Sequence, residues 1–315
     1  MGLTEIAGAI DKAHIIMLVA HIQPDGDTLG SCFALKVMLE RMEKDVFVCC
    51  DGDIPSRYQE LLPADKLQNP LNVSKTVDLA IAVDCADSAR LGRSLKLFRN
   101  AKTTANIDHH VTNDRFAQIN HVCEASSVGE IIFEIMRFCG IEPDEKSAQY
   151  LYIAMSTDTG NFTYSNTNRK CLSYVSEMVE LFDLRNTADV LFRRRSLIAT
   201  QLIGRAISRL EIFESGRIAF VTLLESDLKE FGAHSSDCES VVDFAREIEE
   251  TQAAVFFREL PHGVKISFRS KGGIDVGAVA ALYGGGGHAG ASGCQASGKL
   301  DDVKKSILEK LKGLL

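Results

Sequence analysis

Short apolar runs alternate with amphipathic segments through the first half of the chain. Residues 15–20 are all apolar, and residues 28–41 carry apolar side chains at helical spacing. Three further runs are short enough to be buried strands, at 46–50, 77–83 and 103–107. This alternation predicts an α/β fold with a mostly parallel sheet and helices on both of its faces.

A helix start follows these strands, and the pattern then changes at about residue 185. Ser127 and Glu130 have capping-box spacing, which predicts a helix that stops at Gly140. Residues 185–210 predict one long helix, which holds six arginines and a single acid, Asp189. Either a solvated helix face or a border of the substrate site would account for this positive charge.

The remaining residues predict a smaller mixed α/β domain. Strand-like alternation covers 217–224, 252–259 and 264–268, and helical spacing covers 241–248 and 302–311. The length of 315 residues also suits two domains, at roughly 100–200 residues each. Since 45% of the residues are hydrophobic and 25% are charged, the composition excludes a disordered or fibrous chain.

Charge and cysteine content narrow the class of protein further. The net charge of −8 disfavours binding to long duplex nucleic acid, although short anionic substrates remain compatible with it. Nine cysteines at irregular spacing, with no C-x-x-C pair, predict reduced thiols. No run approaches the roughly 18 apolar residues of a membrane span, and the N-terminus lacks a secretory pattern. We therefore expect a cytoplasmic protein without membrane association.

Four clusters carry candidate chemistry, and three of them directly follow a predicted strand. They are His21-x3-Asp25-x-Asp27, Asp84, Asp108-His109-His110 and the later Asp158. In open α/β sheets the ligand crevice lies at this carboxyl edge of the strands. Taken alone, each cluster has an ordinary structural role, such as a turn or a helix cap.

Together the clusters predict a binuclear metal centre. So many acids in one crevice would repel each other unless cations lie between them. Mixed imidazole and carboxylate ligands suit Mn²⁺, Fe²⁺, Co²⁺ or Zn²⁺, and the excess of oxygen ligands favours two Mn²⁺ ions. A pair of such ions is suited to hydrolysis of a phosphoester.

The four clusters resemble, in order, the motifs of the DHH phosphoesterase superfamily. Residues 21–27 read H-x-x-P-D-G-D, and D-H-H stands at 108–110; Gly284–Gly293 resembles the glycine-rich motif of the associated DHHA1 domain. The length and layout are similar to the nanoRNase/pAp phosphatase branch. The resemblance implies a DHH domain at 1–186, a helical connector at 187–211 and a DHHA1 domain at 212–315.

The resemblance also implies site residues. It implies six metal ligands, which are His21, Asp25, Asp27, Asp84, His109 and Asp158. His21 and Asp25 would hold one ion, Asp84 would bridge both ions, and the other three ligands would hold the second. The implied catalytic residues are Asp84, His110 as an electrophile or proton donor, and Asp108, which would orient a histidine.

Substrate binding is expected in the second domain. Glycines let backbone N–H groups approach a phosphate closely, and arginine suits bidentate phosphate contact. A flexible linker at the glycines and a solvated strand end at Arg269 are the structural alternatives. The candidate substrate-binding residues are Arg269, Ser270, Gly285, Gly286, Gly287 and His288.

The expected activity is metal-dependent hydrolysis of short oligoribonucleotides to mononucleotides, and of pAp to AMP. The exonuclease polarity is not set by the sequence, and a homodimer is compatible with it. The first alternative is a phosphodiesterase for cyclic di-AMP or pApA, which would carry the same catalytic motifs. Family II pyrophosphatase is disfavoured by Gly284–His288, and a non-catalytic nucleotide-binding or RNA-binding regulator by the complete set of metal ligands.

Overall fold

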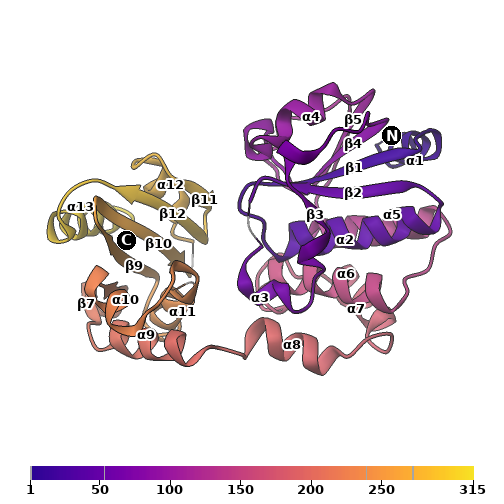
Figure 1. The fold of residues 1–315 in the computed structure, drawn as a ribbon. Helices are drawn as coiled ribbons and strands as arrows, with labels where there is room; N and C mark the ends of the chain where they lie inside the picture. The colour runs from indigo at the N-terminus through magenta and orange to yellow at the C-terminus, as the bar shows by residue number, and fades with distance from the viewer. Residues whose placement is uncertain (1, 53, 239, 272) are drawn as a thin grey trace. The chain divides into compact units, whose positions relative to one another are not determined.

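The computed structural model describes residues 2–52, 54–238, 240–271 and 273–315. The chain divides into two compact units, the first ending at Arg194 and the second beginning at Arg195 (Figure 1). Each unit has its own sheet and its own hydrophobic core. We therefore describe the units one after the other.

The first unit is built on a six-stranded sheet in which every pair of neighbours is parallel. The strand order is β3-β2-β1-β4-β5-β6, so the order reverses between β1 and β4. Ligands bind at such a reversal, beyond the carboxyl ends of the strands. The predicted parallel sheet is thus confirmed. Its strands are β1 (Ile15–Ala20), β2 (Asp45–Cys50), β3 (Leu67–Gln68), β4 (Leu79–Val83), β5 (Thr103–Asp108) and β6 (Ile119–Val122).

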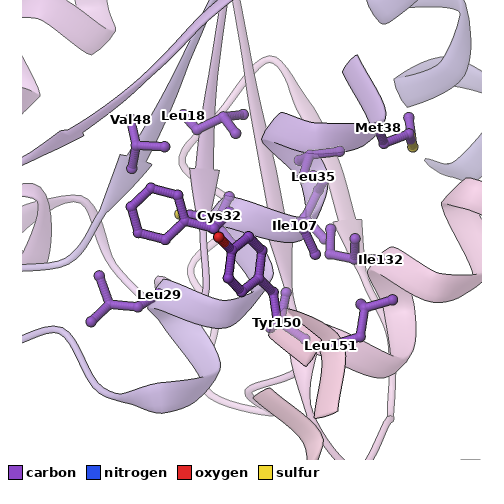
Figure 2. Packing of buried hydrophobic residues seen from close by; sticks show 14 of the residues in the cluster. Leu18, Leu29, Cys32, Leu35, Met38, Val48, Ile107, Ile132, Tyr150 and Leu151 are labelled. Carbon is purple, nitrogen blue, oxygen red and sulfur yellow. The ribbon is translucent and has the colours of Figure 1, made fainter. Parts of the chain in front are cut away.

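Helices cover both faces of this sheet, as the apolar strands require. Along β1, Leu18 faces a large core shared with α2, α5 and α6, while Val19 faces a smaller core shared with α4. Figure 2 shows Leu18 in this core with Leu35 of α2 and Tyr150 of α6. The helices of this unit are α1 (Gly2–Lys12), α2 (Gly26–Arg41), α3 (Ser56–Gln59), α4 (Ser94–Asn100), α5 (Val128–Phe138), α6 (Glu145–Asp158), α7 (Arg169–Met178) and α8 (Leu184–Phe192).

The single long helix expected over 185–210 is wrong. Helix α8 ends at Phe192 and α9 (Leu197–Ile207) begins five residues later. The break has a local cause, because the Ser196 hydroxyl accepts a hydrogen bond from the Ala199 N–H at 3.0 Å and so caps α9. Arg194 before the break is paired with carboxylates of the first unit.

The second unit has a mixed sheet, which confirms the predicted smaller α/β domain. Its order is β11-β12-β10-β9-β8-β7, and only the β8–β9 pair is parallel. Among the described residues, no helix of either unit is long and apolar enough to cross a membrane. The elements are β7 (Glu211–Phe213), β8 (Ile218–Leu223), α10 (Glu225–Phe231), α11 (Val241–Arg246), β9 (Ala253–Leu260), β10 (Gly263–Ser270), α12 (Val276–Ala281), β11 (Gly286–His288), β12 (Ala291–Ala296) and α13 (Leu300–Lys312).

Close approach of α2 and α6 depends on Gly30. A Cβ atom added there would lie 2.4 Å from the carbonyl oxygen of Tyr150 and 2.9 Å from the backbone nitrogen of Ala154. Both atoms belong to the backbone of α6 and cannot rotate away. Any side chain at residue 30 therefore forces the two helices apart.

We expect Gly30→Ala to lower the free energy of unfolding by about 1–3 kcal/mol, because overpacking a core costs that much. The control is Gly8→Ala in α1, where an added Cβ meets nothing within 4 Å. That variant should be neutral or stabilised by up to about 1 kcal/mol. Urea unfolding followed by far-UV circular dichroism measures both, and equal midpoints for the two variants would contradict the close packing.

Candidate metal centre

Polar side chains from separate elements meet at the edge of the first sheet where the strand order reverses. His21 directly follows β1, Asp84 directly follows β4, and Asp108 is the last residue of β5. These three strands are neighbours in the sheet. Asp158 arrives from a helix, because it is the last residue of α6. The clusters that the sequence places after separate strands are therefore brought together by the tertiary fold.

The first group of donor atoms comes from His21, Asp25 and Asp84. His21 Nε2 lies 4.0 Å from Asp25 Oδ2 and 3.8 Å from Asp84 Oδ2. Thr28, which the sequence analysis did not single out, connects the two carboxylates. Its hydroxyl hydrogen-bonds Asp84 Oδ2 at 2.5 Å and Asp25 Oδ1 at 3.1 Å. The N-cap spacing from Asp25 to Thr28 at the start of α2 is the signal that could have identified it.

The second group comes from Asp27, His109 and Asp158. His109 Nε2 lies 4.0 Å from Asp27 Oδ2 and 3.7 Å from Asp158 Oδ2. The same nitrogen lies 3.8 Å from Asp84 Oδ1, so Asp84 faces both groups through its two oxygens. All six predicted metal ligands are thus brought together.

These distances fit metal ions. Two atoms that each bind one ion at about 2.1 Å can be at most about 4.2 Å apart, and every histidine–aspartate distance above is shorter than that limit. These nitrogen–oxygen distances are also too long for direct hydrogen bonds. Asp84 Oδ1 is buried and has no hydrogen-bond partner among the described residues. A cation between this oxygen and the facing nitrogens would satisfy it.

The backbone at Asp84 is strained in a way that aims its side chain at the crevice. Its φ of 60° lies in the left-handed region, which costs a non-glycine residue free energy. The Asp84 N–H still donates to the Ile107 carbonyl at 3.0 Å, which holds it against β5. The sheet therefore imposes this conformation and fixes the carboxylate between the two groups.

His110 is oriented by Asp108. His110 Nδ1 lies 2.8 Å from Asp108 Oδ1, and Asn113 donates to Asp108 Oδ2 at 2.6 Å. Burial alone would raise the pKa of Asp108, but these hydrogen bonds and the charge of His110 lower it overall. An ionised Asp108 accepts a hydrogen bond from the Nδ1–H group of His110 and so fixes the orientation and tautomer of the ring. Asn113 was missed from the sequence because a polar loop residue gives no distinctive signal.

Several aspartates of the candidate centre have raised pKa values because they are buried close to one another. Burial, followed by the charges of nearby aspartates, raises the pKa values of Asp27 and Asp84 well above the usual range. Burial likewise raises the pKa of Asp158 to about 6. Burial lowers the pKa of His21 to about 4, which keeps its imidazole neutral. Neutral imidazole is the form that binds a metal, and divalent cations would favour the ionised carboxylates.

In the second unit, two predicted substrate-binding side chains have internal partners. Arg269 Nε donates to Asp243 at 3.1 Å, and Nη1 donates to the Phe268 carbonyl at 3.0 Å. The Ser270 hydroxyl donates to the Ile274 and Ala289 carbonyls at 2.7 and 3.1 Å. Ser270 thus holds the turn that precedes β12.

The glycine-rich segment forms part of a hairpin. Gly286 and Gly287 in β11 pair with Gly293 and Ser292 in β12. A Cβ atom at Gly285 would lie 2.2 Å from the Gly293 carbonyl oxygen, so this position requires glycine for close approach. The backbone of His288 ends β11, and its side chain lies outside the described part of the structure.

Family models match both units. Residues 15–155 match the DHH family, N-terminal domain, and residues 216–315 match the DHHA1 domain. A bifunctional oligoribonuclease and PAP phosphatase NrnA of Thermus thermophilus is 29% identical over 94% of this chain and 89% of its own length. The Bacillus subtilis protein of the same name is 28% identical over 92% of each chain.

Solved structures show the same fold. An exopolyphosphatase-related protein from Bacteroides fragilis has a TM-score of 0.93 and 25% identity, and the match covers 99% of this chain and 97% of that one. The exonuclease RecJ of Thermus thermophilus, in complex with Mn²⁺, has a TM-score of 0.58 and 14% identity, over 100% of this chain and 55% of its own.

We expect Mn²⁺ to raise the melting temperature more at pH 7.5 than at pH 5.0. Asp158, with a pKa of about 6 when folded and 3.8 ordinarily, contributes stability at low pH that is lost as the pH rises through 6. Cation binding offsets this loss, by about 2.7 kcal/mol at 100 times the dissociation constant. Differential scanning fluorimetry with and without Mn²⁺ measures the effect.

Asp158→Asn is the informative comparison for this experiment. It mimics the protonated carboxyl, so the variant should be more stable than the wild type at pH 7.5 without metal and should gain less from Mn²⁺. Equal stabilisation of both proteins at both pH values would show that Mn²⁺ binds elsewhere.

Proposed function

The chain belongs to the DHH/DHHA1 phosphoesterase superfamily, and on that premise we propose that it hydrolyses short oligoribonucleotides to mononucleotides and pAp to AMP. The observation that carries the proposal is the convergence of the two donor groups on Asp84, at distances of 3.7–4.0 Å. The NrnA relatives, which match nearly the whole chain, support the choice of substrates.

The proposed cofactor is a pair of divalent cations, with Mn²⁺ favoured. His21 and Asp25 would hold one ion, and Asp84 would contact both. The remaining ligands, Asp27, His109 and Asp158, would hold the other. When bound, the ions would supply the activation of water and the charge neutralisation that phosphoester hydrolysis needs. The Mn²⁺ complex of RecJ, which has the same fold, and the oxygen-rich donor set support manganese.

His110 would act beside the ions on the reacting phosphate. Asp108 accepts a hydrogen bond from the Nδ1–H group of His110, which fixes the ring and would stabilise a positive charge on it. A ring held in this way can donate a proton from Nε2 to the leaving oxygen, or stabilise the charge that develops on the phosphate. Asp108 would therefore be a positioning residue for His110.

The second domain would bind the nucleotide. The hairpin of β11 and β12 presents a glycine-rich backbone, and its N–H groups suit a phosphate. His288 ends this segment and would add a contact. Arg269 and Ser270 would support the site. The Ser270 hydroxyl donates to the carbonyl of Ala289, which lies in the turn between β11 and β12. None of the nine cysteines forms a disulfide among the described residues, which supports a reducing compartment, and we place the enzyme in the cytoplasm.

A substrate panel with purified protein in Mn²⁺ tests the proposed activity. We expect turnover of di- to pentanucleotide RNA and of pAp, loss of activity on chelation and recovery with Mn²⁺. Asp84→Ala should lose nearly all turnover, whereas Asp114→Ala, an exposed aspartate on the loop after β5, should keep it. Preference for cyclic di-AMP or pApA would select the first alternative, and pyrophosphate hydrolysis alone would reject the proposal.

The nucleotide-binding role is tested separately by His288→Ala. We expect a raised KM for dinucleotides with unchanged metal content, because the substitution would remove a binding contact and no metal ligand. His262→Ala, an exposed histidine on the turn between β9 and β10, is the matched control. Wild-type KM and kcat in His288→Ala would exclude the role, and a loss of kcat at constant KM would point to contact in the transition state.

A further inference from the structure

One short segment contacts ligands of only one of the two donor groups. This segment, residues 125–129, runs into the start of α5. The Ala125 carbonyl lies 3.2 Å from His109 Nδ1, which fixes that nitrogen as the donor and leaves Nε2 toward the donor group. The N–H groups of Val128 and Gly129 donate to the two carboxylate oxygens of Asp27, at 2.7 and 3.0 Å.

The third ligand of this group is tied to the same segment through Asn166. The Asn166 Nδ2 group donates to the Ser126 carbonyl at 2.9 Å and to the Asp158 carbonyl at 3.1 Å. It also lies 3.4 Å from Asp158 Oδ2. The position of segment 125–129 therefore sets the positions of Asp27, His109 and Asp158 together.

A single buried carboxylate holds segment 125–129 in place. Glu130 is 1% exposed, and its Oε2 accepts hydrogen bonds from the Ser126 N–H at 3.0 Å and the Ser126 hydroxyl at 2.6 Å. The same oxygen accepts from Asn168 at 3.2 Å, at the start of α7. Glu130 thus does not complete the predicted capping box with Ser127. It bonds the residue before the cap.

The other donor group has separate support. Thr28 hydrogen-bonds both Asp25 and Asp84, and His21 Nδ1 is buried without a partner among the described residues. The contacts of Glu130 involve none of these residues. A change at Glu130 should therefore reach one group and not the other.

We propose that Glu130 is a positioning residue that sets the affinity of the ion held by Asp27, His109 and Asp158. The inference rests on the proposed two-ion function. Loss of a residue that orients metal ligands in this way typically lowers metal affinity about 10–100-fold. The ion held by His21 and Asp25 should be unaffected.

Mn²⁺ titration of the full-length protein, followed by the EPR signal of free Mn²⁺, tests the proposal. Glu130→Met removes the acceptor and keeps the size of the side chain. It should weaken the binding of one of the two Mn²⁺ ions about 10–100-fold. Glu130→Gln keeps one carbonyl acceptor for Ser126 and should restore most of that affinity. Glu134→Met is the control, because Glu134 lies one turn further along α5 and bonds Tyr174.

Double variants identify which ion responds. In an Asp25→Asn background, the remaining ion is the one held by Asp27, His109 and Asp158, and its affinity should fall when Glu130→Met is added. In an Asp158→Asn background the remaining ion should not respond to it. The opposite pattern, or equal weakening of both ions by Glu130→Met alone, would overturn the selective role.

Asn166→Ala covers the case in which Glu130→Met fails to fold. Its side chain is exposed, so its removal leaves the core intact, and it should weaken the same ion. If the wild type binds two ions and Asn166→Ala and the folded Glu130 variants bind them equally well, the inference is wrong. If the wild type itself fails to bind two ions, the proposed function fails first.

Discussion

Repulsion among buried carboxylates is the constraint on which the centre of this protein depends. Asp27 and Asp84 are nearly inaccessible to water, and their pKa values are raised by burial and by the charges of nearby aspartates, Asp25 among them. A fold that brings such groups together gains nothing in stability from them. Cations would neutralise these groups, which is the role we propose for the two metal ions.

The packing of the surrounding scaffold provides the stability that this arrangement of carboxylates lacks. The strands of the first sheet are buried on both faces, and the packing of α2 against α6 is close enough to require glycine at residue 30. A rigid sheet can impose the left-handed backbone at Asp84, which an isolated loop would relax. The site therefore places its candidate ligands at the ends of strands and helices of a rigid scaffold.

The two donor groups are supported in different ways. One is joined by a hydroxyl, that of Thr28, whereas the other is joined to a segment of backbone that a buried carboxylate holds. Backbone N–H groups at the start of α5 also stabilise the charge of Asp27, since a helix N-terminus favours an anion. Such asymmetry would give each of the two proposed ions its own determinants of affinity.

The sequence by itself predicted four strands of the first sheet and the polar residues that follow three of them, but it joined α8 and α9 into one helix. A strand that is buried on both faces has an unbroken apolar sequence. A polar residue directly after such a run, such as His21 or Asp84, is therefore easy to recognise. Tertiary structure alone decided the partners of those residues. Asp27 is held by N–H groups about a hundred positions away. The Ser127 hydroxyl caps α5 at the Glu130 N–H as the spacing indicated, but the Glu130 carboxylate bonds Ser126 and not the Ser127 N–H. Local pattern specifies which residues face inward, but the hydrogen bond that each buried polar group makes depends on what the fold brings within about 3 Å.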